Sequence, residues 1–295
     1  MGRGSYRASD WTKLKQSRGI TNSSSANTIF TTTKAKEQYL PKFINMRESR
    51  DSEDSPNSTP VILGFDVTGS MGYLAEEIAK NALNETVTQI YAKNPVTNPH
   101  IMCAAFVEAE DPDGLQVTQF EADIRVVEQL LDLRVGFGGN WYSYDSLLWY
   151  FAAKHTSIDS FEKRGKKGIL IGIGDEIADN QDRHILSKKE IEDMFGDKVD
   201  KDITLAQAYA MASEKYEIIH IITGENQENA WKSWTELPYM KGRVAILDPK
   251  DINCLSEVIT SILQLINKSN RDDIINQWDA KDRALVKKAI REIEF

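Results

Sequence analysis

The 295 residues carry a net charge of −9, and 41% hydrophobic and 27% charged residues suit a globular protein with one large core. No stretch approaches the roughly 20 apolar residues of a membrane-spanning helix, and no apolar run near the N-terminus resembles a secretion signal. The two cysteines, Cys103 and Cys254, form neither a C-x-x-C pair nor a disulfide framework, which favours a reducing compartment. We therefore expect a cytoplasmic protein that does not enter a membrane.

The charge is unevenly distributed along the chain. Residues 1–50 contain ten Lys and Arg and three acidic residues, a balance of +7, so the remainder carries −16. A basic arm on an acidic body can contact nucleic acid. This arm has no dense Lys/Arg block, so we favour the simpler interpretation that it lies across the acidic body. Residues 1–58 are expected to form a polar N-terminal extension and linker.

A regular alternation of strands and helices follows. The run Val61-Ile62-Leu63-Gly64-Phe65 is apolar throughout, which is typical of a strand buried on both faces of a parallel sheet. A turn signal at residues 111–114 predicts that the second and third strands pair as an antiparallel hairpin. Further strands are expected at residues 101–107, 115–120, 168–174, 218–223 and 244–247, and helices at residues 74–92, 124–133, 144–155, 205–215 and 252–266.

This order of elements predicts an α/β fold. Strands that alternate with helices form a doubly wound, mostly parallel sheet with helices on both faces, here with one antiparallel edge strand. We assign this Rossmann-like domain to residues 59–266. Residues 267–295 are highly charged but keep spaced apolar residues, so we expect a C-terminal helical extension that packs on the domain or on a partner.

Side chains with oxygen atoms follow two of the expected strands, and another lies in the middle loop of the domain. Asp66, Thr68 and Ser70 occupy alternate positions of the loop that leaves the first strand, and Asp175 follows the fourth. Asn140 lies in a loop between two helices. In open α/β sheets, ligands collect at the carboxyl ends of the strands, so these loops are expected to meet. Carboxylate, hydroxyl and amide oxygens are hard donors, suited to Mg²⁺ or Mn²⁺.

The pattern Asp66-x-Thr68-x-Ser70 after a buried strand resembles the metal-ion-dependent adhesion site (MIDAS) of von Willebrand factor A (vWA) domains. The usual motif of that family is D-x-S-x-S, and Thr68 keeps the hydroxyl group. The family fold, a doubly wound sheet with one antiparallel edge strand, is similar to the fold expected for residues 59–266.

The two other ligand positions of the family also have counterparts. Gly138-Gly139-Asn140 stands where the family usually has Thr after a Gly-Gly pair, and Asp175 matches the Asp that ends its fourth strand. Two departures accompany this match. Asn140 replaces the Thr, and Glu176 follows Asp175 where Gly is frequent in the family.

The resemblance implies a non-enzymatic module for protein–protein interaction, of the intracellular bacterial or phage type. In this family, an Asp or Glu of a partner protein typically completes the shell of the Mg²⁺ ion. Intracellular members often work in multiprotein assemblies, sometimes beside MoxR-type AAA ATPases. The expected partner is therefore a protein with an exposed acidic residue, and neither a membrane nor nucleic acid.

Two alternatives stay open. Residues 68–72 approximate the G-x-S-x-G elbow of serine hydrolases, with Ser70 as the nucleophile. Such an enzyme needs a histidine base. His220 lies within an apolar strand and is expected in the core, whereas His184 lies in a polar loop. The other alternative is a vWA-type scaffold without a metal, in which Asp66 caps its own turn.

Overall fold

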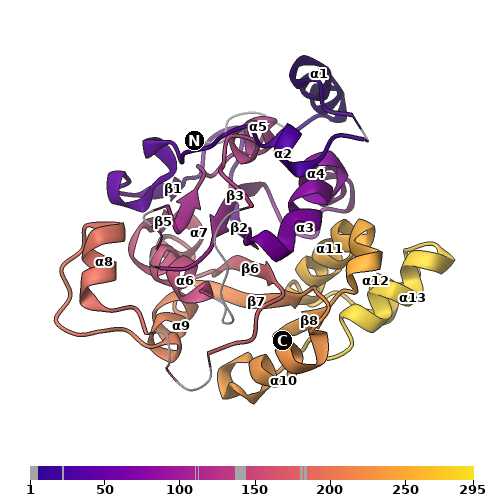
Figure 1. Ribbon diagram of the computed structural model, residues 1–295. Coiled ribbons are helices and arrows are strands. Elements are labelled where there is room, and N and C mark those ends of the chain that lie inside the picture. The colour runs from indigo at the N-terminus through magenta and orange to yellow at the C-terminus, as the bar shows by residue number, and fades with distance from the viewer. Residues whose placement is uncertain are drawn as a thin grey trace.

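A six-stranded sheet forms the centre of the molecule in the computed structural model (Figure 1), which describes residues 6–21, 23–109, 111, 113–136, 144–179, 182 and 185–295. Its strand order is β4-β3-β2-β6-β7-β8. The antiparallel partner of β3 is β4, and all other neighbouring strands are parallel. The strands are β2 (Thr59–Asp66), β3 (Pro99–Phe106), β4 (Leu115–Val117), β6 (Gly168–Gly174), β7 (Tyr216–Ile222) and β8 (Val244–Ile246). The predicted doubly wound α/β fold with one antiparallel edge strand is therefore confirmed.

Helices cover both faces of the sheet (Figure 1). One face packs against α3 (Gly72–Glu77), η4 (Ile78–Ala82), α4 (Leu83–Lys93), α5 (Arg125–Leu130) and α11 (Leu255–Ile266). The other packs against α6 (Asp145–Lys154), α8 (Lys188–Phe195), α9 (Leu205–Ser213) and α10 (Gln227–Glu236). Within the described ranges, no helix is both long and apolar enough to cross a bilayer.

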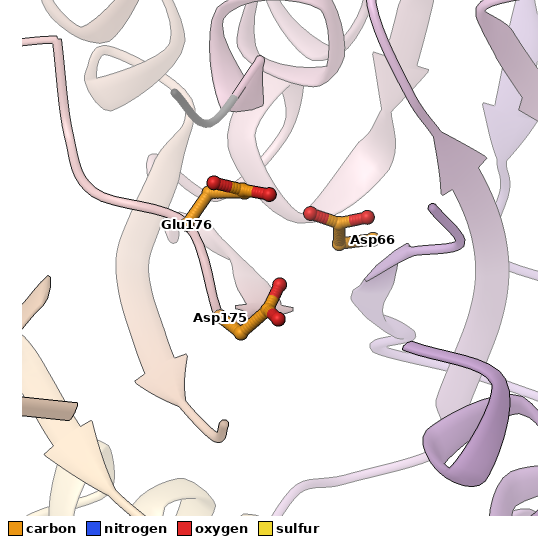
Figure 2. A group of neighbouring side chains, drawn as sticks. All are labelled: Asp66, Asp175 and Glu176. Carbon is orange, nitrogen blue, oxygen red and sulfur yellow. The ribbon is translucent and has the colours of Figure 1, made fainter. Parts of the chain in front are cut away.

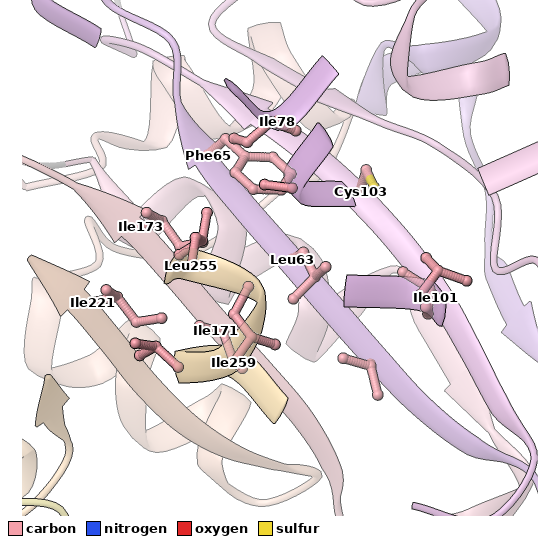
Figure 3. Packing of buried hydrophobic residues seen from close by; sticks show 14 of the residues in the cluster. Leu63, Phe65, Ile78, Ile101, Cys103, Ile171, Ile173, Ile221, Leu255 and Ile259 are labelled. Carbon is pink, nitrogen blue, oxygen red and sulfur yellow. The ribbon is translucent and has the colours of Figure 1, made fainter. Parts of the chain in front are cut away.

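The central strands supply apolar side chains to both faces. In β2, Val61, Leu63 and Phe65 join the core under α11 and α3, whereas Ile62 joins the core on the α6 side. Figure 3 shows Leu63 and Phe65 of β2 near Ile171 and Ile173 of β6, with Leu255 and Ile259 of α11 in front of the sheet. This alternation explains the continuous apolar runs of the sequence, because side chains of a strand point to opposite faces in turn.

The buried helix α6 approaches the sheet closely at two glycines. A Cβ atom on Gly64 of β2 would lie 2.2 Å from Cδ2 of Leu148, and one on Gly172 of β6 would lie 2.2 Å from Oδ1 of Asp145. Larger residues at either position would push this helix away from the sheet. Asp145 and Leu148 both belong to α6 and are buried.

Three features differ from the expected elements. The single helix expected at residues 74–92 contains a π-helical segment, η4, between α3 and α4. A separate two-stranded parallel sheet joins β1 (Arg47–Ser49) to β5 (Thr156–Ile158). The helices α8 and α10 lie where no helix was expected.

Both extensions pack on the domain. The N-terminal one contains α1 (Ala8–Arg18), α2 (Ala26–Ile29), η1 (Glu37–Tyr39) and η2 (Pro41–Phe43), and its apolar residues Trp11 and Phe30 join the main core. Its basic residues Arg18 and Lys36 form ion pairs with Asp132, at 3.2 and 2.7 Å. The C-terminal one contains α12 (Arg271–Asn276) and α13 (Ala280–Ala289), which contact α11.

Candidate metal centre

Three carboxylates meet where the strand order of the sheet reverses. From β2 the chain proceeds outward through β3 and β4, and then returns to β6 on the other side of β2. Asp66 is the last residue of β2, and Asp175 and Glu176 directly follow β6. These strands are parallel neighbours, so their carboxyl ends lie side by side. Such switch points are the usual ligand sites of open α/β sheets.

The three side chains are turned toward a common point (Figure 2). One carboxylate oxygen from each of Asp66, Asp175 and Glu176 lies within 4.8 Å of the others. Asp66 is 3% exposed, whereas the two other residues are partly exposed. Oδ1 of Asp175 is buried and has no hydrogen-bond partner within the described residues. A buried carboxylate oxygen without a donor is unfavourable unless a cation or another donor approaches it.

The loop after β2 arranges its hydroxyl groups at the same place. The backbone N–H of Thr68 donates to Oδ1 of Asp66 at 2.9 Å, which is the turn cap expected of an Asp at this position. The hydroxyl oxygens of Thr68 and Ser70 are 3.2 Å apart. Thr68 is buried and Ser70 is exposed, so the loop presents one hydroxyl group inside the site and one at its mouth.

Burial and mutual repulsion favour the protonated forms of these acids. Burial raises the pKa of Asp66 to about 7, opposed by hydrogen bonds from Thr68 and reinforced by the charge of Asp175. Burial raises the pKa of Glu176 to about 8, and the charges of Asp175 and Asp66 add to this. The pKa of Asp175 is also raised by burial, although a hydrogen bond from Ser70 opposes the shift. The cluster therefore favours a bound proton or a cation.

The donor set fits a hard divalent cation. Carboxylates of Asp66, Asp175 and Glu176 and hydroxyl groups of Thr68 and Ser70 are all oxygen ligands, which Mg²⁺ and Mn²⁺ prefer. No sulfur or imidazole ligand accompanies the three carboxylates in this group. The described residues thus form a candidate site for a divalent metal ion, and their oxygen donors suit both of these metals.

The third predicted loop is described only where it begins. The backbone N–H of Gly136 donates to the carbonyl oxygen of Val67 at 2.9 Å, so this loop starts beside the one that carries Thr68. Gly138, Gly139 and Asn140 lie outside the described residues. The ligand role of Asn140 therefore stays a prediction.

Three contributors to the site were not anticipated. Glu176 had been noted only as a departure from the family pattern, yet its carboxylate joins those of Asp66 and Asp175. Gly224 has a φ of +145°, and a Cβ atom there would lie 2.3 Å from Cβ of Asp175. Tyr73 donates to or accepts from Thr223 at 3.2 Å, and burial raises the pKa of its phenol to about 12. The charges of Asp175 and Asp66 also raise this pKa, so the phenol lies near the cluster, and no sequence pattern around Tyr73 predicts this position.

The expected core histidine is part of a buried polar pair. His220 and Asp145 are each 1% exposed, and Nδ1 of His220 lies 3.3 Å from Oδ1 of Asp145. The His220 ring stacks on Trp234, with ring centroids 4.0 Å apart. The described partners of Ser70 are Thr68 and Asp175, and neither is a histidine. His184 lies outside the described residues.

Comparisons with known proteins give similarity only at the level of the fold. No family model matches the chain, and neither does any curated protein. The pilus adhesin SpaC from Lactobacillus rhamnosus GG, in its open conformation, has a TM-score of 0.46 and 12% identity over 78% of this chain and 31% of the adhesin chain. A second structure of that adhesin has a TM-score of 0.47 and 11% identity over 74% and 32%. This chain thus spans about a third of the length of these adhesin chains, and similarity of this degree carries no information on function.

Proposed function

We propose that this chain is a metal-dependent protein–protein interaction module of the vWA type, with Mg²⁺, or Mn²⁺ in its place, at a MIDAS-like site. The observation that carries the proposal is the convergence of Asp66, Asp175 and Glu176 to within 4.8 Å, beside the Thr68 and Ser70 hydroxyl groups. Structural turn caps alone do not require three carboxylates from two strand ends to face one another.

Each residue has a distinct part in this proposal. Asp66 and Asp175 would bind the ion with their carboxylates, and Thr68 and Ser70 with their hydroxyl groups. Asn140 is proposed as a further ligand from the middle loop. When bound, the ion would act as a Lewis acid that accepts a carboxylate from an Asp or Glu of the partner.

Glu176 sets a condition on that partner. Two carboxylates neutralise a divalent ion, so a third leaves the site with a negative charge that opposes an acidic partner. In the metal-free site, burial and the neighbouring acids raise the pKa of Glu176 to about 8, whereas a bound cation would favour its ionised form. We propose that the Glu176 carboxylate is displaced when the partner's acid approaches the metal.

Affinity capture with the purified chain of 295 residues tests this function. We expect a partner protein to be retained in Mg²⁺ and released by EDTA. A MoxR-type AAA ATPase is one example of such a partner. Asp66→Ala should abolish retention, and Asp193→Ala, which removes an exposed acid of α8, should not. Neutralising single acidic residues of the captured protein should identify the one that binds the metal.

Two outcomes would contradict this proposal. Retention that is the same in EDTA and in the Asp66→Ala protein would mean that the surface binds partners without a metal. Turnover of an ester substrate that survives EDTA and is lost in Ser70→Ala would instead indicate a hydrolase.

A further inference from the structure

A second polar cavity lies at the opposite edge of the sheet from Asp66. It has a volume of about 140 Å³ and includes Thr59 of β2 and Ile169 of β6, at the amino ends of these two parallel strands. Ile266, the last residue of α11, closes another side. The cavity is thus separated from the candidate metal centre by the length of β2, and its chemistry does not depend on that site.

The wall of this cavity is basic. Arg164, Lys166 and Lys167 line it, and the described lining residues include no carboxylate, although the whole chain carries a net charge of −9. These three cations lie on the short connection between α7 (Asp159–Glu162) and β6. Cations beside a small cavity raise the local concentration of anions where no carboxylate of the protein neutralises them.

The guanidinium group of Arg164 is held in place by the protein. It forms an ion pair with Asp51 and donates from Nη2 to the carbonyl oxygen of Ser58 at 2.9 Å. The charge of Arg164 is therefore compensated, and its role is to shape the wall. The uncompensated positive charge must come from the two lysines.

Lys166 and Lys167 provide that charge. Lys166 is exposed, and it forms no ion pair with any residue in the described part of the chain. Nζ of Lys167 lies 3.8 Å from a carboxylate oxygen of Glu217, but Glu217 is bound more closely by Arg243, at 2.7 Å. Both ammonium groups can therefore turn toward an anion at little cost.

The hydroxyl group of Ser160 indicates a ligand independently of the charge of the lysines. It lines the same cavity and is only 3% exposed, and its hydroxyl oxygen has no hydrogen-bond partner within the described residues. Its carbonyl oxygen accepts from the backbone N–H of Lys166 at 2.8 Å, which holds both residues on one turn of the chain. A buried hydroxyl group without a partner is costly, so a ligand that satisfies it gains that free energy.

The size of the cavity restricts the ligand. A cavity needs only about 10–15 Å³ to hold one water molecule, so a volume of about 140 Å³ accommodates a larger group. Sites for drug-sized molecules are typically about 300–1,000 Å³, well above this volume. A small oxyanion fits between these limits.

We propose that this cavity binds a phosphate group, either as inorganic phosphate or as the phosphate of a small monoester. The Ser160 hydroxyl would donate to one phosphate oxygen, and Lys166 and Lys167 would neutralise the charge. Hydrogen bonds from charged donors to phosphate are shorter and stronger than neutral ones, which suits a site with a single buried hydroxyl group.

Calorimetry and thermal unfolding test this site in EDTA, at constant ionic strength set with chloride. Inorganic phosphate and glycerol 3-phosphate are the two probes. We expect phosphate to raise Tm and to bind about tenfold more weakly to Ser160→Ala and to Lys166→Gln, the effect of losing one hydrogen bond to a charged group. Lys163→Gln, which removes a cation of the same connection outside the cavity, should bind like the wild type. Asp66→Ala should also bind normally.

The Ser160→Ala protein separates a binding role from a structural one. Because the hydroxyl group has no partner in the protein, its removal should leave Tm in chloride unchanged or raise it, while the response to phosphate falls. Binding of inorganic phosphate alone, or of both probes, supports the proposal and identifies the ligand class. No response at millimolar phosphate, or equal responses of wild type, Ser160→Ala and Lys166→Gln, would overturn it.

Discussion

At the scale of single residues, Glu176 determines how many negative charges the candidate metal centre holds. Its carboxylate lies within 4.8 Å of those of Asp66 and Asp175, so the metal-free site carries up to three like charges. Burial together with this repulsion raises the pKa of Asp66 and of Glu176, so ionisation of the cluster destabilises the metal-free protein at high pH.

We predict that Glu176→Gln separates metal binding from partner binding. The variant should bind Mg²⁺ more weakly, because one negative charge beside the ion is lost, but retain more of an acidic partner in Mg²⁺, because that same charge no longer repels the partner. In EDTA above pH 8, where Glu176 with its pKa of about 8 is largely ionised, the variant should also have a higher Tm than the wild type. Loss of partner capture in this variant would show instead that Glu176 is needed for the contact.

His100 is a second single residue with a measurable effect, because it contributes to the pH dependence of stability. Its ring is 1% exposed, with Nδ1 at 3.0 Å from the Ser49 hydroxyl and Nε2 at 2.9 Å from the Ser55 hydroxyl. Burial lowers its pKa to about 4. The unfolded chain therefore binds a proton more readily than the folded one, and stability falls as the pH drops below about 6.5.

Urea unfolding of wild type and His100→Gln measures this contribution. Between about pH 8 and about pH 5 the wild type should lose about 2 kcal/mol more than the variant, since one pKa unit corresponds to about 1.4 kcal/mol. The difference between the proteins cancels the contributions of the other acids. Parallel pH profiles would show that His100 is charged as easily in the folded protein as in the unfolded chain.

At the scale of elements, the approach of α6 to β2 depends on Gly64. A Cβ atom there would lie 2.2 Å from Cδ2 of Leu148 and 3.3 Å from Cε1 of Phe106. We predict that Gly64→Ala destabilises the protein by about 1–3 kcal/mol through overpacking. Gly72→Ala is the matched control, because its Cβ would enter open space at a helical φ of −54°, and it should be neutral or slightly stabilising.

A double-mutant cycle identifies the cause. In the presence of Leu148→Ala, the cost of Gly64→Ala should shrink by about 1 kcal/mol or more, because the clashing methyl group is absent. Additive effects in urea unfolding would mean that the cost of Gly64→Ala does not arise from contact with Leu148.

The elements themselves were predictable where the sequence pattern is strong. The apolar runs at residues 61–65 and 168–174 identified β2 and β6 because a strand buried on both faces admits few polar residues. The sequence of β1, Arg47-Glu48-Ser49, has no such pattern, and this strand exists because it pairs with β5. The helix α8 is short, and its main sequence signal is the capping box that Ser187 and Glu190 form at its start.

The sequence also predicted part of the candidate metal centre. Asp66 and Asp175 were expected to meet because parallel strands end at one edge of a sheet, and the structure brings them together. Glu176 was not expected to join them, because successive residues of a strand point to opposite faces. The chain leaves strand geometry after Gly174, and both side chains then reach the same point. Asn140 lies outside the described residues, and its role as a ligand stays a prediction.

At the scale of the whole molecule, both extensions share one core with the domain. Trp278 lies in the C-terminal extension and is 8% exposed, and its indole N–H donates to the Ser261 hydroxyl of α11 at 3.0 Å. The ammonium group of Lys93 lies 5.1 Å from the centre of its ring. These contacts join the C-terminal extension to α4 and α11.

Removing this indole should therefore destabilise the entire protein. We predict that Trp278→Ala lowers the free energy of unfolding by about 3 kcal/mol, with one cooperative transition by both calorimetry and circular dichroism. Lys281→Ala, an exposed residue of α13, should have little effect. An early, separate transition for Trp278→Ala would show that the extension folds independently of the sheet.

Two regions of opposite charge lie at opposite ends of the parallel strands. The acidic cluster lies at the carboxyl edge of the sheet and the basic cavity at its amino edge. A divalent cation and a phosphate would therefore bind at opposite ends of β2, without competition for the same residues.

Titration calorimetry with Mn²⁺ and with Mg²⁺ tests whether Asp66, Asp175 and Glu176 form a metal centre. Above pH 8, where Asp66 and Glu176 with pKa values of about 7 and about 8 are mostly ionised, the wild type should bind a single ion of either metal. Asp66→Ala should bind none, although its circular dichroism spectrum is unchanged, and Asp193→Ala should bind like the wild type. No heat of binding in the wild type, or equal binding by Asp66→Ala, would contradict the metal centre.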